Sequence, residues 1–407
     1  MVKRIKLSLV ISTVAVALFT GCGYDNEDEN VVGADKLISV TPLFDIDSSL
    51  MQNTVTALAP GKPAFGIKGY RVVYGTKNER GEDIKVSGLI TVPVPSQMIL
   101  DGLKAQGKSY SMSIVSNQHG TIFPDVEAPT SNVIATKKPT GIGTMFSAIG
   151  GFVTIQPDFI GFGESVSELH PYLLEKSSAN TVIDMIKAAI KFGNDKQLPL
   201  NGQVYLTGYS EGGYMTLAAA EEIEKNHPDI SLKGVAPMSG PYDLNLIGMG
   251  VMNATTMLRP DFIGGIVSAY ATDFDLGLNN IVNPTYASTI EAGLYNGDKN
   301  STQIQDELTT SVVDFFIPTF RMDFLTNPEN TLRSAFIKNS VDDYKPTTPT
   351  RLYYCGGDTT IDYRISLSAS TKMGVEAINL GDTLGHTECA RPAYGKALAW
   401  FVELRSK

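Results

Sequence analysis

Two kinds of apolar pattern follow one another along this chain. Residues 67–77 and 83–94 are rich in β-branched and aromatic residues and flank a turn-rich segment, NERGE. Such runs predict two antiparallel strands. Beyond them, short apolar runs alternate with segments of helical period, which is typical of a mostly parallel sheet with helices on both faces. The pattern therefore predicts an α/β fold.

The alternating part of the pattern gives the order of the predicted elements. Further strands are expected at 110–120, 150–163, 202–210, 232–241, 350–358 and 375–381. Helices are expected at 180–195, 211–226 and 390–404, where apolar residues recur with helical spacing. Such sheets bind ligands at the carboxyl ends of their strands. Glycine-rich turns follow several of these strands, so we expect the functional site there.

One long stretch, residues 245–348, interrupts the alternation. It contains helical patches such as LTTSVVDFFIPTF and no convincing strand. An insertion of this length at the carboxyl face of a sheet predicts a helical cap beside the site. Added packing without a role in the site is the alternative. The predicted α/β core then comprises residues 51–244 and 349–407.

Residues 1–21 have the three-part layout of a secretory signal peptide. Basic residues lie near the start, an apolar run spans 7–19, and small residues follow. This run is shorter than the ~20 residues that a transmembrane helix needs, and a buried N-terminal helix is the alternative. The sequence LFTGC resembles a bacterial lipobox, with Phe19 where an aliphatic residue is usual. That resemblance implies cleavage before Cys22 and a lipid on this cysteine.

Residues 22–50 are interpreted as a tether and N-terminal extension. Six of the eight residues at 23–30 are Asp, Glu or Asn, a composition that disfavours a packed core. A lipid anchor would hold the globular part on a membrane of the bacterial cell envelope, facing the periplasm or the surface. The chain is 43% hydrophobic and 19% charged, as in globular proteins, and its net charge of −10 gives no support to nucleic-acid binding. Composition leaves the oligomeric state open.

The segment GYSEG, residues 208–212, has the G-x-S-x-G spacing of a serine nucleophile. A predicted strand precedes it and a predicted helix follows it, the context in which this spacing forms a nucleophile elbow. The turn would expose the Oγ of Ser210, and the start of the helix would direct N–H groups toward a developing negative charge. We predict that Ser210 is the nucleophile. A structural Gly-Ser turn is the alternative.

A serine hydroxyl needs a base, and the chain has four histidines. His386 follows the last predicted strand and precedes the last predicted helix, which is the position expected of the base. His227 ends a polar helix and is expected at the surface. His170 lies in a loop that could border the site, and His119 directly follows a predicted strand.

The acid of a triad should lie between the nucleophile and the base in the chain. Asp358 is the first acidic residue after the strand at 350–358 and stands on a Gly-Gly turn, while Asp362 is the alternative. The order Ser210, Asp358, His386 is the order found in α/β hydrolases.

The backbone is expected to supply an oxyanion hole. One donor is the N–H of Glu211, the residue after the nucleophile, and the other comes from the loop QHGTIFP after an early strand. His119, Gly120 and Thr121 resemble the HG motif found at that place. The second donor is the N–H of Gly120 or of Thr121, and the pattern does not choose between them.

Taken together, the motifs resemble the α/β-hydrolase superfamily and, within it, the secretory lipase (lipase A-like) group. The matching segments are QHGT, PDFIGFGES, GYSEGG, MSGPYDL, CGGDTTID and GHTEC. Asp362 stands where the D-x-x-V-P pattern of the group has a proline. The resemblance implies a bacterial lipoprotein member with the α/β-hydrolase fold, hydrolysis of carboxylic esters, a helical cap, and no metal or organic cofactor.

Cys355 and Cys389 are one possible disulfide pair, because the protein is expected outside the cytoplasm and Cys22 is expected to carry lipid. Each cysteine lies three residues from a proposed triad member, Asp358 or His386. If those side chains meet, the cysteines come close, and a bridge would tie the acid loop to the base loop. Two reduced, buried cysteines are the alternative.

The predicted activity is serine-dependent hydrolysis of a small-molecule or lipid ester through an acyl-enzyme. A serine peptidase on the same fold is one alternative, but such enzymes usually carry a β-propeller and too few residues precede the first strand here. A non-catalytic, hydrolase-like binding lipoprotein is the other, but the sequence keeps all three triad residues. A probe for activated serines would label either enzyme and leave the binding protein unlabelled.

Replacing Cys22 with alanine should abolish incorporation of labelled palmitate when the full chain is expressed in a bacterial host. The reason is that the thiol expected to accept the lipid is removed. Cys355 provides a matched control, and C355S should still incorporate the label. Label that persisted in C22A would contradict the predicted anchor.

Overall fold

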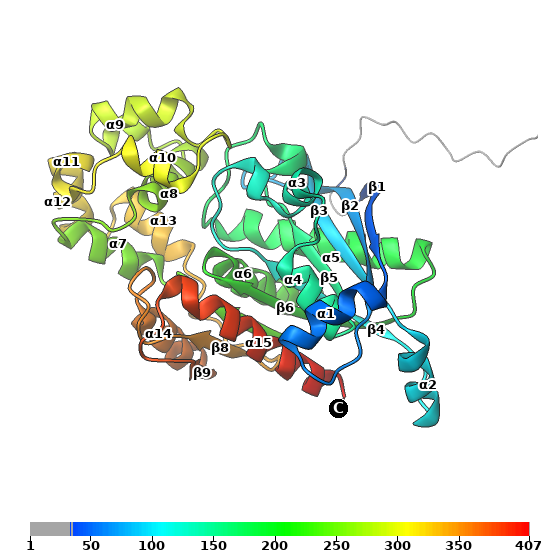
Figure 1. The fold of residues 1–407 in the computed structure, drawn as a ribbon. Helices are drawn as coiled ribbons and strands as arrows, with labels where there is room; N and C mark the ends of the chain where they lie inside the picture. Colours follow the sequence, from blue (N-terminus) through cyan, green and yellow to red (C-terminus); the bar gives the residue numbers. More distant parts are fainter. Residues whose placement is uncertain (1–32, 34–35, 407) are drawn as a thin grey trace, which may run out of the picture. The chain divides into compact units, whose positions relative to one another are not determined.

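The computed structural model describes residue 33 and residues 36–406. The predicted signal peptide, Cys22 and most of the predicted tether lie outside these residues. Within the described part, no helix combines the length and the apolar character needed to cross a membrane. The centre of this part is one mixed sheet of nine strands (Figure 1).

The strands of this sheet follow one another in an order typical of an α/β fold with an antiparallel start. They are β1 (Leu37–Ile46), β2 (Gly66–Lys77), β3 (Asp83–Val94), β4 (Met112–Gln118), β5 (Val153–Pro157), β6 (Leu200–Tyr209), β7 (Ser231–Met238), β8 (Arg351–Tyr354) and β9 (Glu376–Asn379). Their order across the sheet is β1-β2-β3-β5-β4-β6-β7-β8-β9. Pairs involving β1, β2 and β3 are antiparallel, and those from β5 to β9 are parallel. The predicted mostly parallel sheet is confirmed.

Strands β2 and β3 form the predicted antiparallel pair, in register from Gly66 opposite Val94 to Lys77 opposite Asp83. Gly81, with a φ of +86°, occupies the turn between them, where a left-handed backbone suits glycine. Strand β1 was not predicted and lies inside the segment interpreted as an N-terminal extension. Its burial does not alternate, and two register shifts interrupt its pairing with β2, so its sequence lacks a clear period of two.

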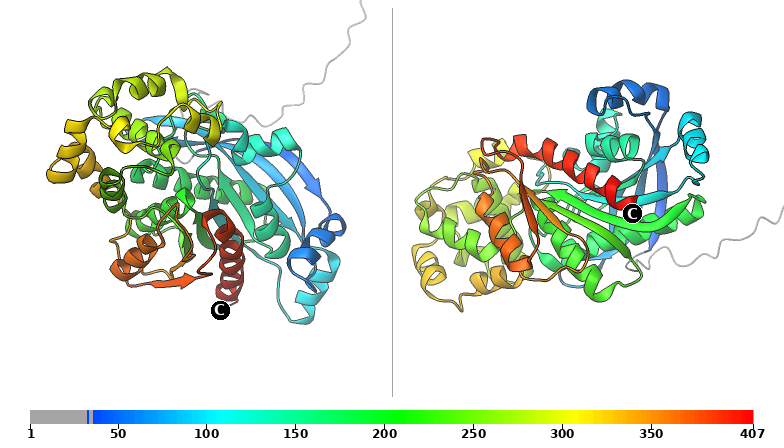
Figure 2. Two further views of the ribbon diagram at one scale, coloured as in Figure 1. Left: turned by 60° about the vertical axis from the view of Figure 1, so that its left-hand side comes forward. Right: turned by 90° about the horizontal axis from the view of Figure 1, so that it is seen from below.

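Alternation along β6 explains why helices cover both faces of the sheet (Figures 1 and 2). Val204 and Leu206 belong to the apolar cluster that includes residues of α5 (Glu175–Asp195) and α6 (Glu211–Asn226). Tyr205 and Tyr209 belong instead to the cluster that includes α15 (His386–Arg405). Successive side chains of a strand point to opposite faces, so a fully buried strand needs apolar cover on each side.

Shorter helices connect the remaining strands. They are α1 (Ser48–Leu58), α2 (Gln97–Ala105), η1 (Asp125–Glu127), α3 (Pro129–Thr136), α4 (Gly141–Gly143), η2 (Thr144–Ile149), η3 (Gly163–Ser165) and α14 (Tyr363–Met373). Among them, η2 packs beside α15, because Phe146 shares the apolar cluster of that helix.

The stretch between β7 and β8 is helical, and its β pairing within the described residues is limited to isolated bridges. Its elements are α7 (Leu244–Asn253), α8 (Pro260–Asp273), η4 (Leu278–Asn280), α9 (Pro284–Thr289), η5 (Ile290–Leu294), α10 (Ser301–Asp306), α11 (Val312–Phe315), α12 (Pro318–Thr326) and α13 (Thr331–Lys338). Buried aromatic residues join these helices, as where Tyr270 meets Phe336 edge to face. The boundaries given above for the cap, residues 245–348, and for the core, residues 51–244 and 349–407, remain predictions.

A disulfide joins Cys355, just after β8, to Cys389 in the first turn of α15. The pairing that the sequence left open is therefore present. Both cysteines are fully buried. The bridge connects the loop after β8 to the start of α15, and these two segments carry the predicted acid and the predicted base.

Candidate active site

Ser210 occupies a sharp turn between β6 and α6. Its φ of 60° and ψ of −122° are rare for a residue with a side chain, and it is the N-cap of α6. Its side chain is nearly buried, with 7% exposure. A strained residue between a strand and a helix is the geometry of a nucleophile elbow, in which the serine Oγ stands at the end of the sheet.

Glycines surround Ser210 because three backbone segments meet there. A Cβ added to Gly208 would lie 2.3 Å from the carbonyl oxygen of Gly212, and one added to Gly212 would lie 2.0 Å from the carbonyl oxygen of Gln118. A Cβ on Gly213 would lie 2.7 Å from the carbonyl oxygen of Met238. The start of α6 is thus pressed against the ends of β4 and β7, an approach that only glycine permits.

The imidazole of His386 lies beside Ser210, with its Nε2 2.9 Å from the serine Oγ. His386 is the first residue of α15, so the helix start fixes its position. The hydroxyl of Tyr209 donates to the carbonyl oxygen of His386 at 2.6 Å, and the two rings lie 5.1 Å apart. The residue before the serine therefore holds the backbone of the histidine.

Asp358 completes a chain of hydrogen bonds. Its Oδ2 lies 2.6 Å from the Nδ1 of His386, and its Oδ1 accepts from the N–H groups of Thr360 and Ile361 at 3.0 Å each. With Nδ1–H donating to the carboxylate, Nε2 is free to accept the serine proton. Burial of Asp358, which is 3% exposed, keeps water from competing for the imidazole.

Asp362, the alternative acid, takes a different role. It is the N-cap of α14, where its carboxylate accepts from the backbone of Arg364 and pairs with the guanidinium of the same residue. These hydrogen bonds lower the pKa of Asp362. The structure thus brings Ser210, His386 and Asp358 together and leaves Asp362 outside this chain.

The segments predicted to form an oxyanion hole lie next to Ser210. Glu211 is the first residue of α6, and the N–H groups of a first turn have no partner within their helix. A Cβ added to Gly120 would lie 3.5 Å from the Cβ of Ser210, so the loop after β4 borders the nucleophile directly. The hydroxyl of Thr121 is hydrogen-bonded to that of Tyr172 at 2.7 Å, which fixes the next residue of the loop.

The other histidines differ in burial and partners. His119 stacks on Phe159 with ring centroids 3.8 Å apart, and burial lowers its pKa. His227 ends α6 at the surface side, as predicted, and lies 3.8 Å from Glu222. His170 forms a buried pair with the side chain of Glu211, at 2.6 Å. No sequence signal points to this pair, because the two residues are distant in the chain and belong to no shared motif.

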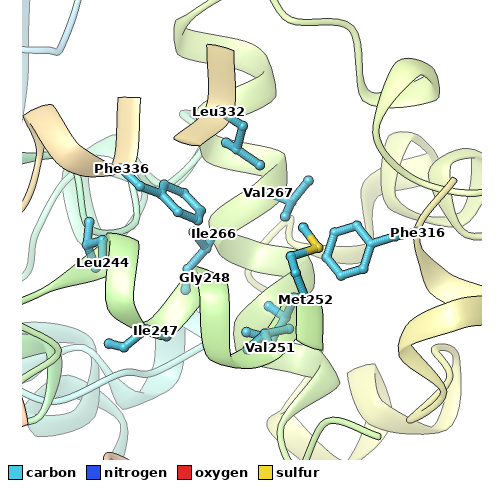
Figure 3. A pocket seen from close by; sticks show the side chains of 11 residues that line it. Leu244, Ile247, Gly248, Val251, Met252, Ile266, Val267, Phe316, Leu332 and Phe336 are labelled. Carbon is cyan, nitrogen blue, oxygen red and sulfur yellow. The ribbon is translucent and has the colours of Figure 1, made fainter. Parts of the chain in front are cut away.

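A cavity of about 230 Å³ opens beside Ser210. Ser210, Glu211 and Tyr172 line it on one side, and cap residues line much of the rest. A smaller apolar pocket of about 30 Å³ lies among α7, α8 and α13 of the cap (Figure 3). Both spaces are lined by Leu244, Ile247, Val251, Ile263 and Ile266. Ser210 therefore faces a largely apolar space whose wall is shared with the pocket inside the cap.

Comparison with known proteins places this geometry among hydrolases. The model of the secretory lipase family matches residues 144–401. Solved structures with a similar fold include the rice cell wall degrading esterase LipA from Xanthomonas oryzae, with 21% identity, a TM-score of 0.77, and 92% of this chain and 98% of that chain covered. Candida antarctica lipase A in its closed state is similar at 14% identity and a TM-score of 0.62, with 90% of this chain and 83% of that chain covered.

A further similar structure comes from Legionella pneumophila, a protein described only provisionally as a hydrolase. It shares 24% identity with a TM-score of 0.79, covering 91% of this chain and 98% of that chain. Comparison with curated proteins gave no match. At these identities the solved structures establish the α/β-hydrolase fold, and the family match establishes the lineage.

Replacing Gly212 with alanine should destabilise the protein by about 2–4 kcal/mol, because the new methyl group would overlap the backbone of Gln118. Chemical denaturation measures this change. Gly395, inside α15 with open space around its Cα, is the matched control. G395A should be neutral or stabilise by up to about 1 kcal/mol. Equal stability of G212A and G395A would show that the close contact at the start of α6 is not required.

Proposed function

The chain belongs to the secretory lipase family and is an ester hydrolase, and we propose that it acts through a Ser210–His386–Asp358 triad. The observation that carries this proposal is the unbroken chain of hydrogen bonds from Ser210 through His386 to Asp358. That chain ends at a strained serine beside a cavity. Each group is thereby placed for the step that acyl transfer demands of it.

In the first half of the reaction, Nε2 of His386 takes the proton of the Ser210 hydroxyl as Oγ bonds to the ester carbonyl carbon. The imidazolium that forms is stabilised by the carboxylate of Asp358. Negative charge develops on the carbonyl oxygen. The N–H of Glu211 and one N–H of the Gly120–Thr121 loop donate to this oxygen, and removal of one such donor typically costs about 10²–10³ in rate.

Collapse of the tetrahedral intermediate completes acylation. The imidazolium of His386 gives its proton to the departing alkoxide, and the alcohol leaves an acyl group on Ser210. Water then attacks this ester while His386 again accepts a proton; His386 returns that proton to the departing Oγ of Ser210, and the acid is released. Every proton in this cycle moves through Nε2 of one histidine, so the reaction needs no metal or organic group.

The cavity favours an ester with an apolar acyl part. Its lining is dominated by aliphatic and aromatic side chains of the cap, and it shares a wall with the small pocket between α7, α8 and α13. Burial of apolar surface contributes roughly 0.8 kcal/mol for each methylene group. An acyl chain that reaches from Ser210 toward this wall would gain affinity with each carbon.

We also infer where the enzyme works. The family is secretory, and the disulfide between Cys355 and Cys389 is consistent with a place outside the cytoplasm. The signal-like start and the lipobox-like LFTGC sequence support anchoring through a lipid on Cys22. The enzyme would then act from a membrane of a bacterial cell envelope.

The triad is tested by substituting its members singly. S210A should lower kcat/KM for p-nitrophenyl esters by at least about 10⁴-fold, because the nucleophile is lost, and D358N should cost a comparable factor through the wrong histidine tautomer. D362N is the matched control and should stay within about twofold, because its ion pair is exposed. A fully active S210A would overturn this assignment, and so would an inactive D362N beside an active D358N.

Val251 lies in the wall that the two apolar spaces share, since it lines both. V251F should narrow the cavity at this wall and lower kcat/KM for long acyl chains by roughly 10–100-fold, while acetyl and butyryl esters change little. V251A, which widens the same point, is the control and should keep or extend the preference for long chains. A chain-length profile identical in all three proteins would reject this path for the acyl chain.

A further inference from the structure

The side chain of Glu211 is a buried carboxyl group at the start of α6. It is 2% exposed, and its Oε1 lies 2.6 Å from Nε2 of His170. The other ring nitrogen of His170, Nδ1, lies 2.7 Å from the carbonyl oxygen of Ile160. An acid beside the nucleophile is therefore joined through one imidazole to the loop that follows β5.

Both ring nitrogens of His170 face acceptors, so the two contacts need two protons, whereas a neutral imidazole carries only one. A carbonyl oxygen only accepts, so Nδ1 of His170 must carry a proton and donate to Ile160. The Nε2–Oε1 contact then needs a second proton between two groups that would otherwise both be acceptors. Burial lowers the pKa of His170, but the charge and hydrogen bond of Glu211 outweigh it and raise the pKa above its usual value.

Aromatic side chains enclose the imidazole of His170. The rings of Phe162 and Tyr172 lie 5.1 Å and 5.7 Å from it, and Phe159 is stacked in parallel at 6.2 Å. Such a surround holds a cation favourably through the negative faces of the rings. A Cβ added to Gly161 would lie 2.7 Å from the backbone of His170, so the loop is packed directly onto this residue.

Strained backbone flanks the same segment. Phe159 and Leu173 have φ values of 71° and 58°, in the left-handed region that large residues rarely adopt. Residues in this region persist where surrounding structure holds them, and they concentrate at functional sites. The position of His170 is thus held from both sides.

We propose that His170 is a positioning residue that carries positive charge and neutralises the carboxylate of Glu211 beside the oxyanion hole. This inference rests on the proposed function, since it assigns the backbone N–H of Glu211 to the oxyanion. It gives a purpose to a side chain that the elbow motif itself does not require.

The need for neutralisation follows from where the charge stands. Glu211 would donate its N–H to an oxygen that becomes negative, while its own carboxylate is held in the same buried part of the site. Two negative charges at short range in a poorly solvated site repel each other, which would raise the barrier to the tetrahedral intermediate. The start of α6 offsets part of this charge through the helix dipole, and the imidazolium of His170 offsets the rest.

Other titratable groups surround the pair. His119 approaches from the loop after β4, Tyr172 from the loop that carries His170, and Tyr214 from α6; each of them feels the charge of Glu211. Arg259 lines the same cavity from the cap. Its Nε and Nη2 donate hydrogen bonds to the carboxylate of Asp261. His386 reaches Ser210 from the opposite side.

The raised pKa fixes the direction of the pH effect. The pair keeps its proton below the folded pKa of His170 and loses it as the pH rises through that value. Above it, the carboxylate of Glu211 faces a bare nitrogen, and its charge opposes the oxyanion. The kcat of the wild-type enzyme should therefore fall as the pH rises through this pKa, and the loss of the proton from the pair should cause part of that fall.

Three variants of the full chain test this role. H170Q keeps a donor toward Glu211 but removes the positive charge, and should lower kcat about 10–100-fold with a smaller change in KM. E211Q can donate a hydrogen bond from its amide to a neutral His170, so it should lower kcat only about threefold. Its kcat should also lack the part of the alkaline decrease that the pair causes. The double variant H170Q/E211Q should recover at least about threefold of the loss in H170Q, because no charge remains to be neutralised.

Controls separate this electrostatic role from simple packing. His227, the residue that follows α6, also faces a glutamate, but outside the site, and H227Q should retain full activity. Equal losses in H170Q and in the double variant, with no recovery, would overturn the proposal.

Nuclear magnetic resonance of protein labelled with ¹⁵N-histidine reads the charge without any substrate. The chain has four histidines, and the signal that disappears in H170Q identifies His170. Two protonated ring nitrogens on His170 at neutral pH are expected in the wild type. A neutral imidazole there, in an enzyme that hydrolyses esters, would overturn this inference alone. A folded wild type that hydrolyses no ester would instead overturn the proposed function, together with the role given to His170.

Discussion

The close contact between the start of α6 and the ends of β4 and β7 is the constraint on which this site depends. Gly208, Gly212 and Gly213 allow backbone to meet backbone at distances where a Cβ would overlap. This contact forces Ser210 into its left-handed turn and aims the first N–H groups of α6 at the space above the serine. It also brings the loop of Gly120 beside the nucleophile. We therefore attribute the positions of Ser210, of the first N–H groups of α6 and of the Gly120 loop to this one close contact.

Two buried pairs of histidine and carboxylate converge on this turn from different sides. His386 and Asp358 are supplied by segments that a disulfide joins, so the base and its orienting acid are connected covalently as well as by hydrogen bonds. His170 and Glu211 join the loop after β5 to the residue that follows the serine. We assign to the first pair the proton transfer of the reaction, and to the second pair the balance of charge around the oxyanion. A buried site needs both, because uncompensated charge is costly there.

The sequence was sufficient for those parts of the site that rest on local rules. The strand, turn and helix around Ser210 were predictable because G-x-S-x-G sits between a clear strand and a clear helix, and the position of His386 because it alone among four histidines follows the last strand and precedes the last helix. The choice of Asp358 over Asp362 agrees with the contacts, since Asp362 is used as a helix cap. The antiparallel start and the parallel sheet were predicted for the same reason, that their apolar periods are regular.

Long-range contacts account for what the sequence did not reveal. Strand β1 has an irregular pattern and gains its conformation from pairing with β2, so its residues were taken for part of an extension. The partner of the Glu211 side chain lies 41 residues away, and no local rule joins the two positions. Cysteine count and compartment leave Cys355 and Cys389 as one possible pair, and only the expected meeting of Asp358 and His386 favours a bridge over two reduced cysteines. In each case tertiary packing decides the outcome.

The central claim is that Ser210 is activated as a nucleophile. Treatment of the folded protein with a fluorophosphonate, followed by peptide mapping with mass spectrometry, tests it most directly. One adduct for each chain is expected, located on Ser210, and it should be lost when the protein is unfolded before treatment. A folded protein that forms no adduct, or forms it on another serine, would show that Ser210 is not the activated nucleophile.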